Sequence, residues 1–442
     1  MRSTLALLGL CSLLAAQPTP ADVATKADAY VQSFVRDGLF RGTVLVARDG
    51  QPIFRKAYGN ANDEWDIANT VDTKFRIGSI TKQFTAVAIL QFVEQGKLKL
   101  DDPISKHYAA PATWEKITIH HLLNHTSGIP SYTGLPGFMA KRSVEKMTPV
   151  EIVKLSQDMP LEFEPGASYK YNNTGYVLLG HLVEKISGTS YGAYMAATFF
   201  GPLGLKDTGY DSSTKILKHR ASGYSPNGDN AAYLDMSLPH AAGSLYSTVD
   251  DLLKWDLALH GGKLLSAESY KLMTTPGKGE YGYGLVMREV AGRPSIAHGG
   301  GINGFNTNLI HFPAQRVVGI ALANVNTPAA DQIALAIARI AMGDEQAPRP
   351  LRKEVKVAPE RLDLLSGEYE LRPGFIMKIW RDGERMLTQA TGQGAIEIFA
   401  LSENQFFPKV VDAQLNFERD ASGRATAMTL RQGSAELRGV RK

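Results

Sequence analysis

The chain has 442 residues, of which 44% are hydrophobic and 21% are charged, so it can form more than one domain with a sizeable core. Its formal net charge of +4 is small and evenly spread, which gives no reason to expect a nucleic-acid partner. The single cysteine, Cys11, lies near the N-terminus. The rest of the chain therefore has no disulfide, no thiolate metal site and no cysteine nucleophile.

Residues 1–21 are predicted to be a signal peptide followed by a short leader. Arg2 supplies a positive charge, Leu5–Ala16 form a short apolar run, and small residues at Ala15–Ala16 or Ala21 offer cleavage sites. The apolar run is too short to span a bilayer comfortably, and no later segment has about 18 uninterrupted apolar residues. The sequence therefore predicts a secreted or periplasmic protein without a stable membrane span.

Residues 22–342 are predicted to form an α+β domain. Val23–Val35 is expected to be an amphipathic helix, and strands at Thr43–Ala47 and Pro52–Tyr58 are joined by a turn. A closing helix is expected at Ala329–Met342. Four consecutive antiparallel strands precede this helix, with Gly299–Gly301 as one of the turns between them: Tyr281–Glu289, Pro294–His298, Asn306–Phe312 and Val317–Ala323. Strands at both ends of the domain, with helices inserted between them, predict an antiparallel sheet flanked by helices.

The C-terminal part of the chain has a different character. Residues 343–360 are rich in proline and charge, which predicts a linker. Residues 361–442 contain short β-type runs separated by turns such as Asp382-Gly383. This pattern predicts an all-β meander of seven or eight strands that forms a small barrel.

The first motif with chemical meaning is Ser79 followed three residues later by Lys82, at the start of an apolar helix that ends near Gly96. Residues three apart lie on one helix face with Cβ atoms roughly 5–6 Å apart, so the lysine amine can reach the serine hydroxyl. This spacing is a known nucleophile signature. A helix-capping serine beside a solvated lysine is the structural alternative.

Two further motifs follow in the chain: Tyr171-Asn172-Asn173 before a predicted helix, and His298-Gly299-Gly300-Gly301 at the predicted end of a strand. With Phe-Arg-Ile-Gly before the serine, the ordered set resembles the serine hydrolase family of class C β-lactamases, D,D-peptidases, D-aminopeptidases and family VIII esterases. The resemblance covers roughly residues 25–342. The β-rich end, which opens with Gly367-Glu368-Tyr369, more loosely resembles the lipocalin-like domain that some members carry.

The resemblance implies that Ser79 attacks a carbonyl group and forms an acyl-enzyme. Tyr171 is favoured as the base that takes its proton, and a neutral Lys82 is the alternative. Asn173 is expected to bind the substrate's amide and to hold Lys82. The structural alternatives are a core aromatic for Tyr171 and a helix N-cap for Asn173.

The glycine motif is expected to bind substrate as well. The backbone N–H groups of Ser79 and Gly301 would form an oxyanion hole, and Gly299 and Gly300 would let the backbone approach the substrate. His298 stands where related lactamases carry the lysine of Lys-Thr-Gly. Histidine carries its full charge only below about pH 6.5, so this departure disfavours tight binding of a substrate carboxylate and efficient β-lactam hydrolysis.

The sequence predicts a serine hydrolase that cleaves an amide or ester bond, with D-amino-acid peptides and small esters as leading substrates. A class C-type β-lactamase, a penicillin-binding protein without turnover and a scaffold that works through its β domain are the alternatives. His120, His121 and His125 invite a zinc interpretation but lack the glutamate of a zincin. No motif calls for a metal or an organic cofactor, and the sequence leaves the oligomeric state open.

Overall fold

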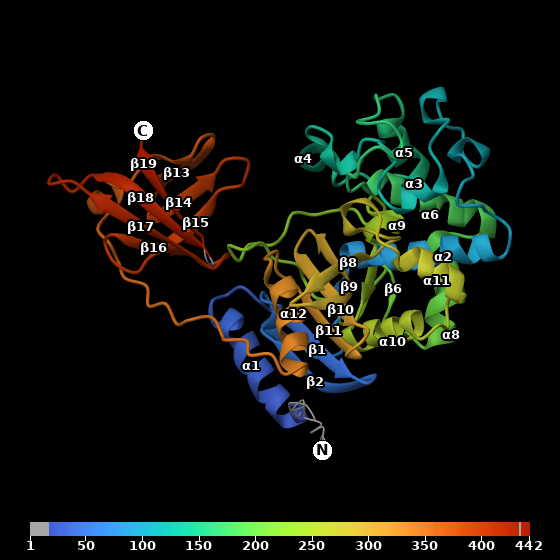
Figure 1. The fold of residues 1–442 in the computed structure, drawn as a ribbon, viewed down its shortest axis with the longest axis horizontal. Helices are drawn as coiled ribbons and strands as arrows, with labels where there is room; N and C mark the ends of the chain where they lie inside the picture. The colour runs from blue at the N-terminus through green and yellow to red at the C-terminus, as the bar shows by residue number, and fades with distance from the viewer. Residues whose placement is uncertain (1–16, 433–434) are drawn as a thin grey trace, which may run out of the picture.

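The computed structural model describes residues 17–432 and 435–442 (Figure 1). A larger body of helices and a six-stranded sheet is followed by a closed eight-stranded barrel, which confirms the predicted fold class. Most of the predicted signal peptide, residues 1–16, lies outside the described residues. None of the helices in the described part of the chain is long and apolar enough to cross a membrane.

The central sheet is antiparallel and has the strand order β2-β1-β11-β10-β9-β8. Its strands are β1 (Gly42–Arg48), β2 (Gln51–Tyr58), β8 (Val286–Val290), β9 (Arg293–Ile302), β10 (Phe305–Phe312) and β11 (Val317–Ala323). The N-terminal hairpin thus joins the C-terminal strands, because β1 pairs with β11 over its whole length, from Gly42 opposite Ala323 to Arg48 opposite Val317. Both predicted groups of strands therefore belong to one sheet.

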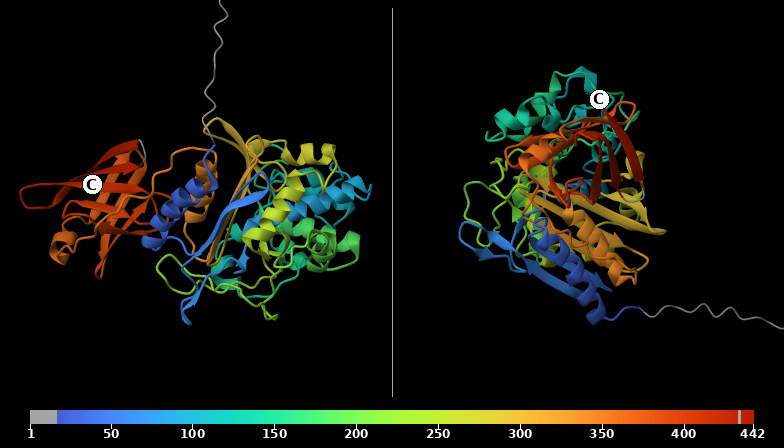
Figure 2. Two further views of the ribbon diagram at one scale, coloured as in Figure 1. Left: turned by 90° about the horizontal axis from the view of Figure 1, so that it is seen from below. Right: turned by 90° about the vertical axis from the view of Figure 1, so that its left-hand side faces the viewer.

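Helices cover both faces of this sheet. On one face α1 (Pro20–Arg36) packs against α12 (Ala329–Ala341), and Figure 2 (left) shows both helices on the side toward the barrel. On the other face lie α10 (Val249–His260) and the main helical core. The remaining helices are α2 (Thr81–Glu94), α3 (Ile119–Leu123), α4 (Phe138–Arg142), α5 (Pro149–Gln157), α6 (Asn173–Ser187), α7 (Tyr191–Met195), α8 (Gly201–Leu203), α9 (His240–Gly243), α11 (Ala267–Thr274) and α13 (Pro359–Asp363).

The predicted turn at Gly299–Gly301 is wrong. Strand β9 continues through these glycines to Ile302, and each pairs with a residue of β10. The chain turns instead at Asn303-Gly304, where Gly304 has a φ of +81°. A glycine run permits a turn but does not require one. Within the strand, Gly300 is required because a Cβ atom there would overlap the Ile77 carbonyl oxygen.

The barrel confirms the predicted β-rich end, and its eight strands agree with the seven or eight that were expected. Its strands are β12 (Gly367–Arg372), β13 (Phe375–Asp382), β14 (Arg385–Ala390), β15 (Ile396–Ala400), β16 (Gln405–Pro408), β17 (Ala413–Arg419), β18 (Ala425–Gln432) and β19 (Ala435–Arg441). The last strand closes the barrel by pairing with β12. Five short strands lie in the larger body: β3 (Asn60–Asn62), β4 (Ile67–Ala68), β5 (Phe75–Arg76), β6 (Gly209–Tyr210) and β7 (Leu245–Ser247).

The segment between α12 and α13 has no helix or strand, yet it is bonded to both bodies. Arg349 forms an ion pair with Asp37, just after α1, at 2.9 Å from Nε to Oδ2. Its Nη2 donates to the Lys409 carbonyl oxygen, next to β16, at 2.9 Å. One guanidinium group therefore links the larger body to the barrel.

Candidate active site

Lys82 lies at the centre of a buried polar network. It is in the first turn of α2, its side chain has no solvent exposure, and Nζ has three oxygen partners. These are Ser79 Oγ at 3.0 Å, Asn173 Oδ1 at 2.9 Å and the Ala242 carbonyl oxygen at 2.8 Å. Lys82 forms no ion pair within the described ranges, and burial lowers its pKa well below the ordinary value.

Ser79 sits in a 3₁₀ turn, Gly78–Ile80, that leads into α2. The preceding residue, Ile77, fixes this turn because its N–H donates to the Leu245 carbonyl oxygen at 2.9 Å. The Ile77 carbonyl oxygen in turn accepts from Thr307 Oγ1 of β10 at 3.0 Å. The serine is thus held between the helical core and the central sheet, at the start of the helix that the sequence predicts.

Asn173 is the first residue of α6, and it faces Lys82. Its Nδ2 donates to Thr133 Oγ1 at 3.1 Å, and its backbone N–H donates to Ser131 Oγ at 3.1 Å. The N-cap of α6 is the neighbouring Asn172, whose Oδ1 accepts from the Gly175 N–H at 2.7 Å. The capping role that the sequence leaves open for Asn173 therefore belongs to Asn172.

Tyr171 lies against the lysine amine, with Lys82 Nζ 4.7 Å from its ring centre. Its buried hydroxyl has no hydrogen-bond partner among the described residues. Burial raises the pKa of Tyr171, and the nearby Ser79 hydroxyl opposes this rise. His125 supports the aromatic ring at 4.3 Å between ring centres, and its Nδ1 accepts from the Asn172 N–H at 3.2 Å. Tyr171 is therefore a phenol held in a fixed position.

His298 lies beside this group but is only 4% exposed. Its Nδ1 is 2.6 Å from the Gly299 carbonyl oxygen, which can only accept, so Nδ1 carries the proton. Nε2 then accepts from the Tyr281 hydroxyl at 2.9 Å. Burial is the main cause that lowers the pKa of His298 to about 3. The ring is neutral at pH 7, and both of its nitrogens are already bonded.

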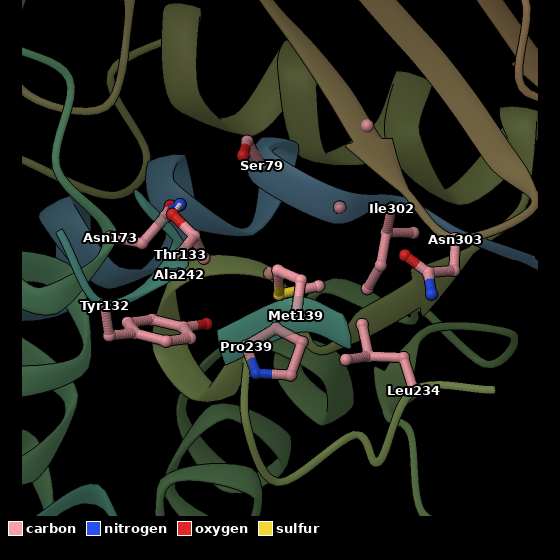
Figure 3. Close-up of a pocket in the computed structure, with 13 residues that line it drawn as sticks. Ser79, Tyr132, Thr133, Met139, Asn173, Leu234, Pro239, Ala242, Ile302 and Asn303 are labelled. Atoms are coloured by element: carbon pink, nitrogen blue, oxygen red, sulfur yellow. Dashed lines mark hydrogen bonds between the residues drawn. The ribbon is translucent and has the colours of Figure 1, made fainter. Parts of the chain in front are cut away.

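A cavity of about 120 Å³ opens in front of Ser79. Figure 3 shows Ser79 on one side and the apolar side chains of Met139, Pro239 and Leu234 on the other. None of the residues around this cavity is charged. The full set is Gly78, Ser79, Tyr132, Thr133, Met139, Asn173, Leu234, Pro239, Ala242, Gly243, Gly301, Ile302 and Asn303.

The structure brings Ser79, Lys82, Tyr171 and Asn173 together, with Gly301 at the cavity. The cavity is not lined by His298, Gly299 or Gly300. Sequence reasoning missed the Ala242 carbonyl group and the apolar wall of the cavity. These come from segments far from the motifs, and a backbone carbonyl leaves no residue-type signal in a single sequence.

Gly300 is packed so tightly that a methyl group has no room. A Cβ atom there would overlap the Ile77 carbonyl oxygen and approach Thr307 Oγ1 at 2.5 Å. We expect Gly300→Ala to displace the Ser79 turn, to destabilise the fold by roughly 1–3 kcal/mol and to lower kcat at least about tenfold. Thermal unfolding and ester hydrolysis measure the two effects. Gly394→Ala is the control, because nothing lies within 4 Å of its added Cβ. Unchanged kcat in Gly300→Ala would contradict the expectation.

Comparison with known proteins gives the family of the chain. Residues 27–342 match the family model described as Beta-lactamase, and residues 351–440 match a domain of unknown function, DUF3471. A penicillin-binding protein of Bacillus subtilis (strain 168) is 28% identical over 430 residues, which are 90% of this chain and 94% of that protein.

Two solved structures are similar in fold and sequence. A D-stereospecific amidohydrolase from Streptomyces sp. is 30% identical with a TM-score of 0.60, covering 72% of this chain and 98% of that one. An octameric penicillin-binding protein homologue from Pyrococcus abyssi is 26% identical with a TM-score of 0.66, covering 94% of this chain and 99% of that one. The family model spans more than half of the chain, and the site geometry agrees with a serine hydrolase. The chain therefore belongs to the Beta-lactamase family.

Proposed function

We propose that this hydrolase cleaves amides or esters through an acyl intermediate on Ser79, with Lys82 in its neutral amine form as the base. The full burial of Lys82 without an ion-pair partner among the described residues carries this proposal, and the arrangement around Nζ can accommodate the neutral amine. Two of its partners, Asn173 Oδ1 and the Ala242 carbonyl oxygen, can only accept. A neutral amine has two N–H groups for these oxygens and keeps one lone pair for the Ser79 hydroxyl. Burial without a carboxylate partner favours this neutral form.

In the proposed reaction the Ser79 proton moves to Lys82 Nζ as Oγ bonds to the substrate carbonyl carbon. The backbone N–H groups of Ser79 and Gly301 stabilise the oxyanion. The bond to the leaving group then breaks, and the leaving nitrogen or oxygen takes up a proton. Water attacks the acyl-serine in the second half, and its proton passes to the base as the acid leaves and Ser79 is restored.

Tyr171 is proposed as the group that delivers the proton to the leaving atom. Its raised pKa keeps it a phenol, and its hydroxyl has no partner in the described chain. The phenolate that remains is reprotonated by the Lys82 ammonium beside it, which restores the neutral amine for the second half of the reaction. The role of Tyr171 as the base stays a prediction. Tyr171 would have to be a phenolate in that role, and burial disfavours the phenolate.

The uncharged cavity supports a small, neutral acyl group as the substrate's acyl part. No cation lies among its lining residues to pair with a carboxylate, and His298 is neutral at pH 7. Burying an unpaired carboxylate is costly. Esters and amides of neutral acids fit better than substrates that end in a carboxylate, and amides are the substrate class suggested by the name of the Streptomyces relative, a D-stereospecific amidohydrolase.

Hydrolysis of two matched esters tests this function. We expect kcat/KM for p-nitrophenyl butyrate to exceed that for mono-p-nitrophenyl succinate at least about 100-fold at pH 7, because the succinyl carboxylate finds no cation. Faster cleavage of the succinyl ester would contradict the neutral pocket.

Intact-protein mass spectrometry with a penicillin, followed over time, examines the nucleophile. A lasting adduct on Ser79 supports a peptidase or esterase, and rapid drug loss without an adduct indicates a β-lactamase.

We also propose export through the segment at residues 1–21, and the domain limits 22–342, 343–360 and 361–442. Arg2 and the apolar run at Leu5–Ala16 support the signal peptide. The change of composition after residue 342 supports the linker. The intact mass of the protein recovered from the periplasm or medium measures the cleavage position. A mass that includes residues 1–16 would rule out signal-peptide removal.

A further inference from the structure

A second buried polar cluster lies away from the residues of the Ser79 cavity, between α10 and the central sheet (Figure 1). Asp256 and His260 stand four residues apart on α10, so their side chains share one face of the helix. His311 comes from β10. The Asp256 side chain has no solvent exposure, and those of His260 and His311 are nearly buried.

The three side chains turn their ligand-type atoms toward one another. His311 Nδ1 is 2.8 Å from Asp256 Oδ2, and His260 Nε2 is 3.4 Å from Asp256 Oδ1. One ligand atom from each residue lies within 4.8 Å of the others, the only such group of three found in the described residues. Ligand atoms bound to a tetrahedral zinc ion at about 2.0–2.1 Å lie roughly 3.3 Å apart. The two distances from Asp256 to the histidines are within about half an ångström of that spacing. The two histidine rings are stacked with their centres 4.1 Å apart, so a ring must turn to direct both nitrogens at one ion.

Two features suggest that the cluster is more than a hydrogen-bonded contact. Asp256 Oδ1 is buried and has no hydrogen-bond partner among the described residues, which is costly for a carboxylate oxygen. His260 Nδ1 is 2.7 Å from the Tyr270 hydroxyl. If Nδ1 donates to this hydroxyl, Nε2 keeps its lone pair, and such outer partners are typical of metal-bound histidines.

We propose that Asp256, His260 and His311 bind one divalent transition-metal ion, for which Zn²⁺ is the best match, and that the ion joins α10 to the central sheet. Two imidazole nitrogens and one carboxylate form a ligand set that zinc commonly uses. On binding, the ion takes the place of the proton between His311 Nδ1 and Asp256, and the His311 ring carries its proton on Nε2 instead. The ion has no part in the hydrolytic reaction, so this site and the Ser79 site are tested independently.

Metal retention by the untagged full-length protein tests the site. The protein is stripped with a chelator, mixed with equimolar Zn²⁺ at micromolar concentration, passed through a desalting column and analysed for metal. We expect about one zinc per chain, a Tm that rises by several degrees with the ion, and visible absorption typical of four-coordinate Co²⁺ when cobalt replaces zinc. Less than about 0.1 zinc per chain would overturn the proposal and leave a metal-free hydrogen-bonded cluster.

Variants locate the bound ion. His260→Gln and His311→Gln should each lose the zinc and the Tm increase, while His219→Gln, at an exposed histidine, should retain both. Circular dichroism checks that each variant is folded, and the measurement on the unaltered protein stands even if one variant is not. Full zinc retention in His260→Gln or His311→Gln would overturn the assignment to these residues.

Discussion

Ser79→Ala is expected to lower kcat for a neutral ester by at least about 10⁴-fold, because no acyl-enzyme can form without the hydroxyl. The fold should be unaffected. Ser79 lines the cavity, and among the described residues its hydroxyl is hydrogen-bonded to Lys82 alone. Loss of activity with an unchanged Tm is therefore the expected pair of results.

Ester hydrolysis, circular dichroism and mass spectrometry with a penicillin measure these effects together. Ser105→Ala is the matched control, because Ser105 is exposed and lies outside the cavity. The control should behave as the unaltered protein does in both assays, while Ser79→Ala should show neither ester hydrolysis nor an adduct. Turnover by a clean Ser79→Ala preparation at more than about a tenth of the normal rate would reject Ser79 as the nucleophile.

Lys82→Arg is expected to lower kcat by about 10²–10⁴, although it keeps a long cationic side chain. Arginine stays protonated at any accessible pH and cannot accept the serine proton. Lys263→Arg, at an exposed position, is the control and should leave kcat unchanged. Full activity in Lys82→Arg would exclude a neutral amine as the base.

The pH dependence of kcat/KM separates the two candidate bases. Lys82 acts in its deprotonated form, and burial lowers its pKa from 10.5. Activity should then rise with pH through this lowered pKa and reach a plateau below pH 10. A Tyr171 base must be a phenolate, and the pKa of Tyr171 is raised above its ordinary value of 10.0. Activity that still rises tenfold per pH unit at pH 10 would favour Tyr171.

Local patterns predicted much of this molecule. Short apolar runs bounded by turns marked the central strands, and the Ser79–Lys82 spacing brought the two side chains to within 3.0 Å. The fold class and the family are confirmed. The catalytic and binding roles stay predictions, because the structure shows which side chains are close together and does not show a reaction.

Long-range contacts account for what the sequence did not reveal. The partial positive charge that the sequence suggests for His298 requires contact with solvent. His298 is instead buried beside Tyr281, and this burial makes the ring neutral. Gly300 must be a glycine within its strand because the Ile77 carbonyl oxygen, more than 200 positions earlier in the numbering, occupies the space that a side chain would need. Likewise Asp256 and His311 meet only when α10 packs on the sheet. Such neighbours cannot be found from the periodicity of one segment.

The pairing of β1 with β11 also has a consequence for how the protein is made. Gly42 lies opposite Ala323, so two of the middle strands of the sheet come from opposite ends of the larger body. During synthesis the first hairpin must wait, with one edge unpaired, until almost the whole of this body has left the ribosome. Contacts this distant in the chain make folding slow. The topology thus delays folding during translation, and the exposed edge of the first hairpin stays open to wrong pairing until the last strands of this body have been made.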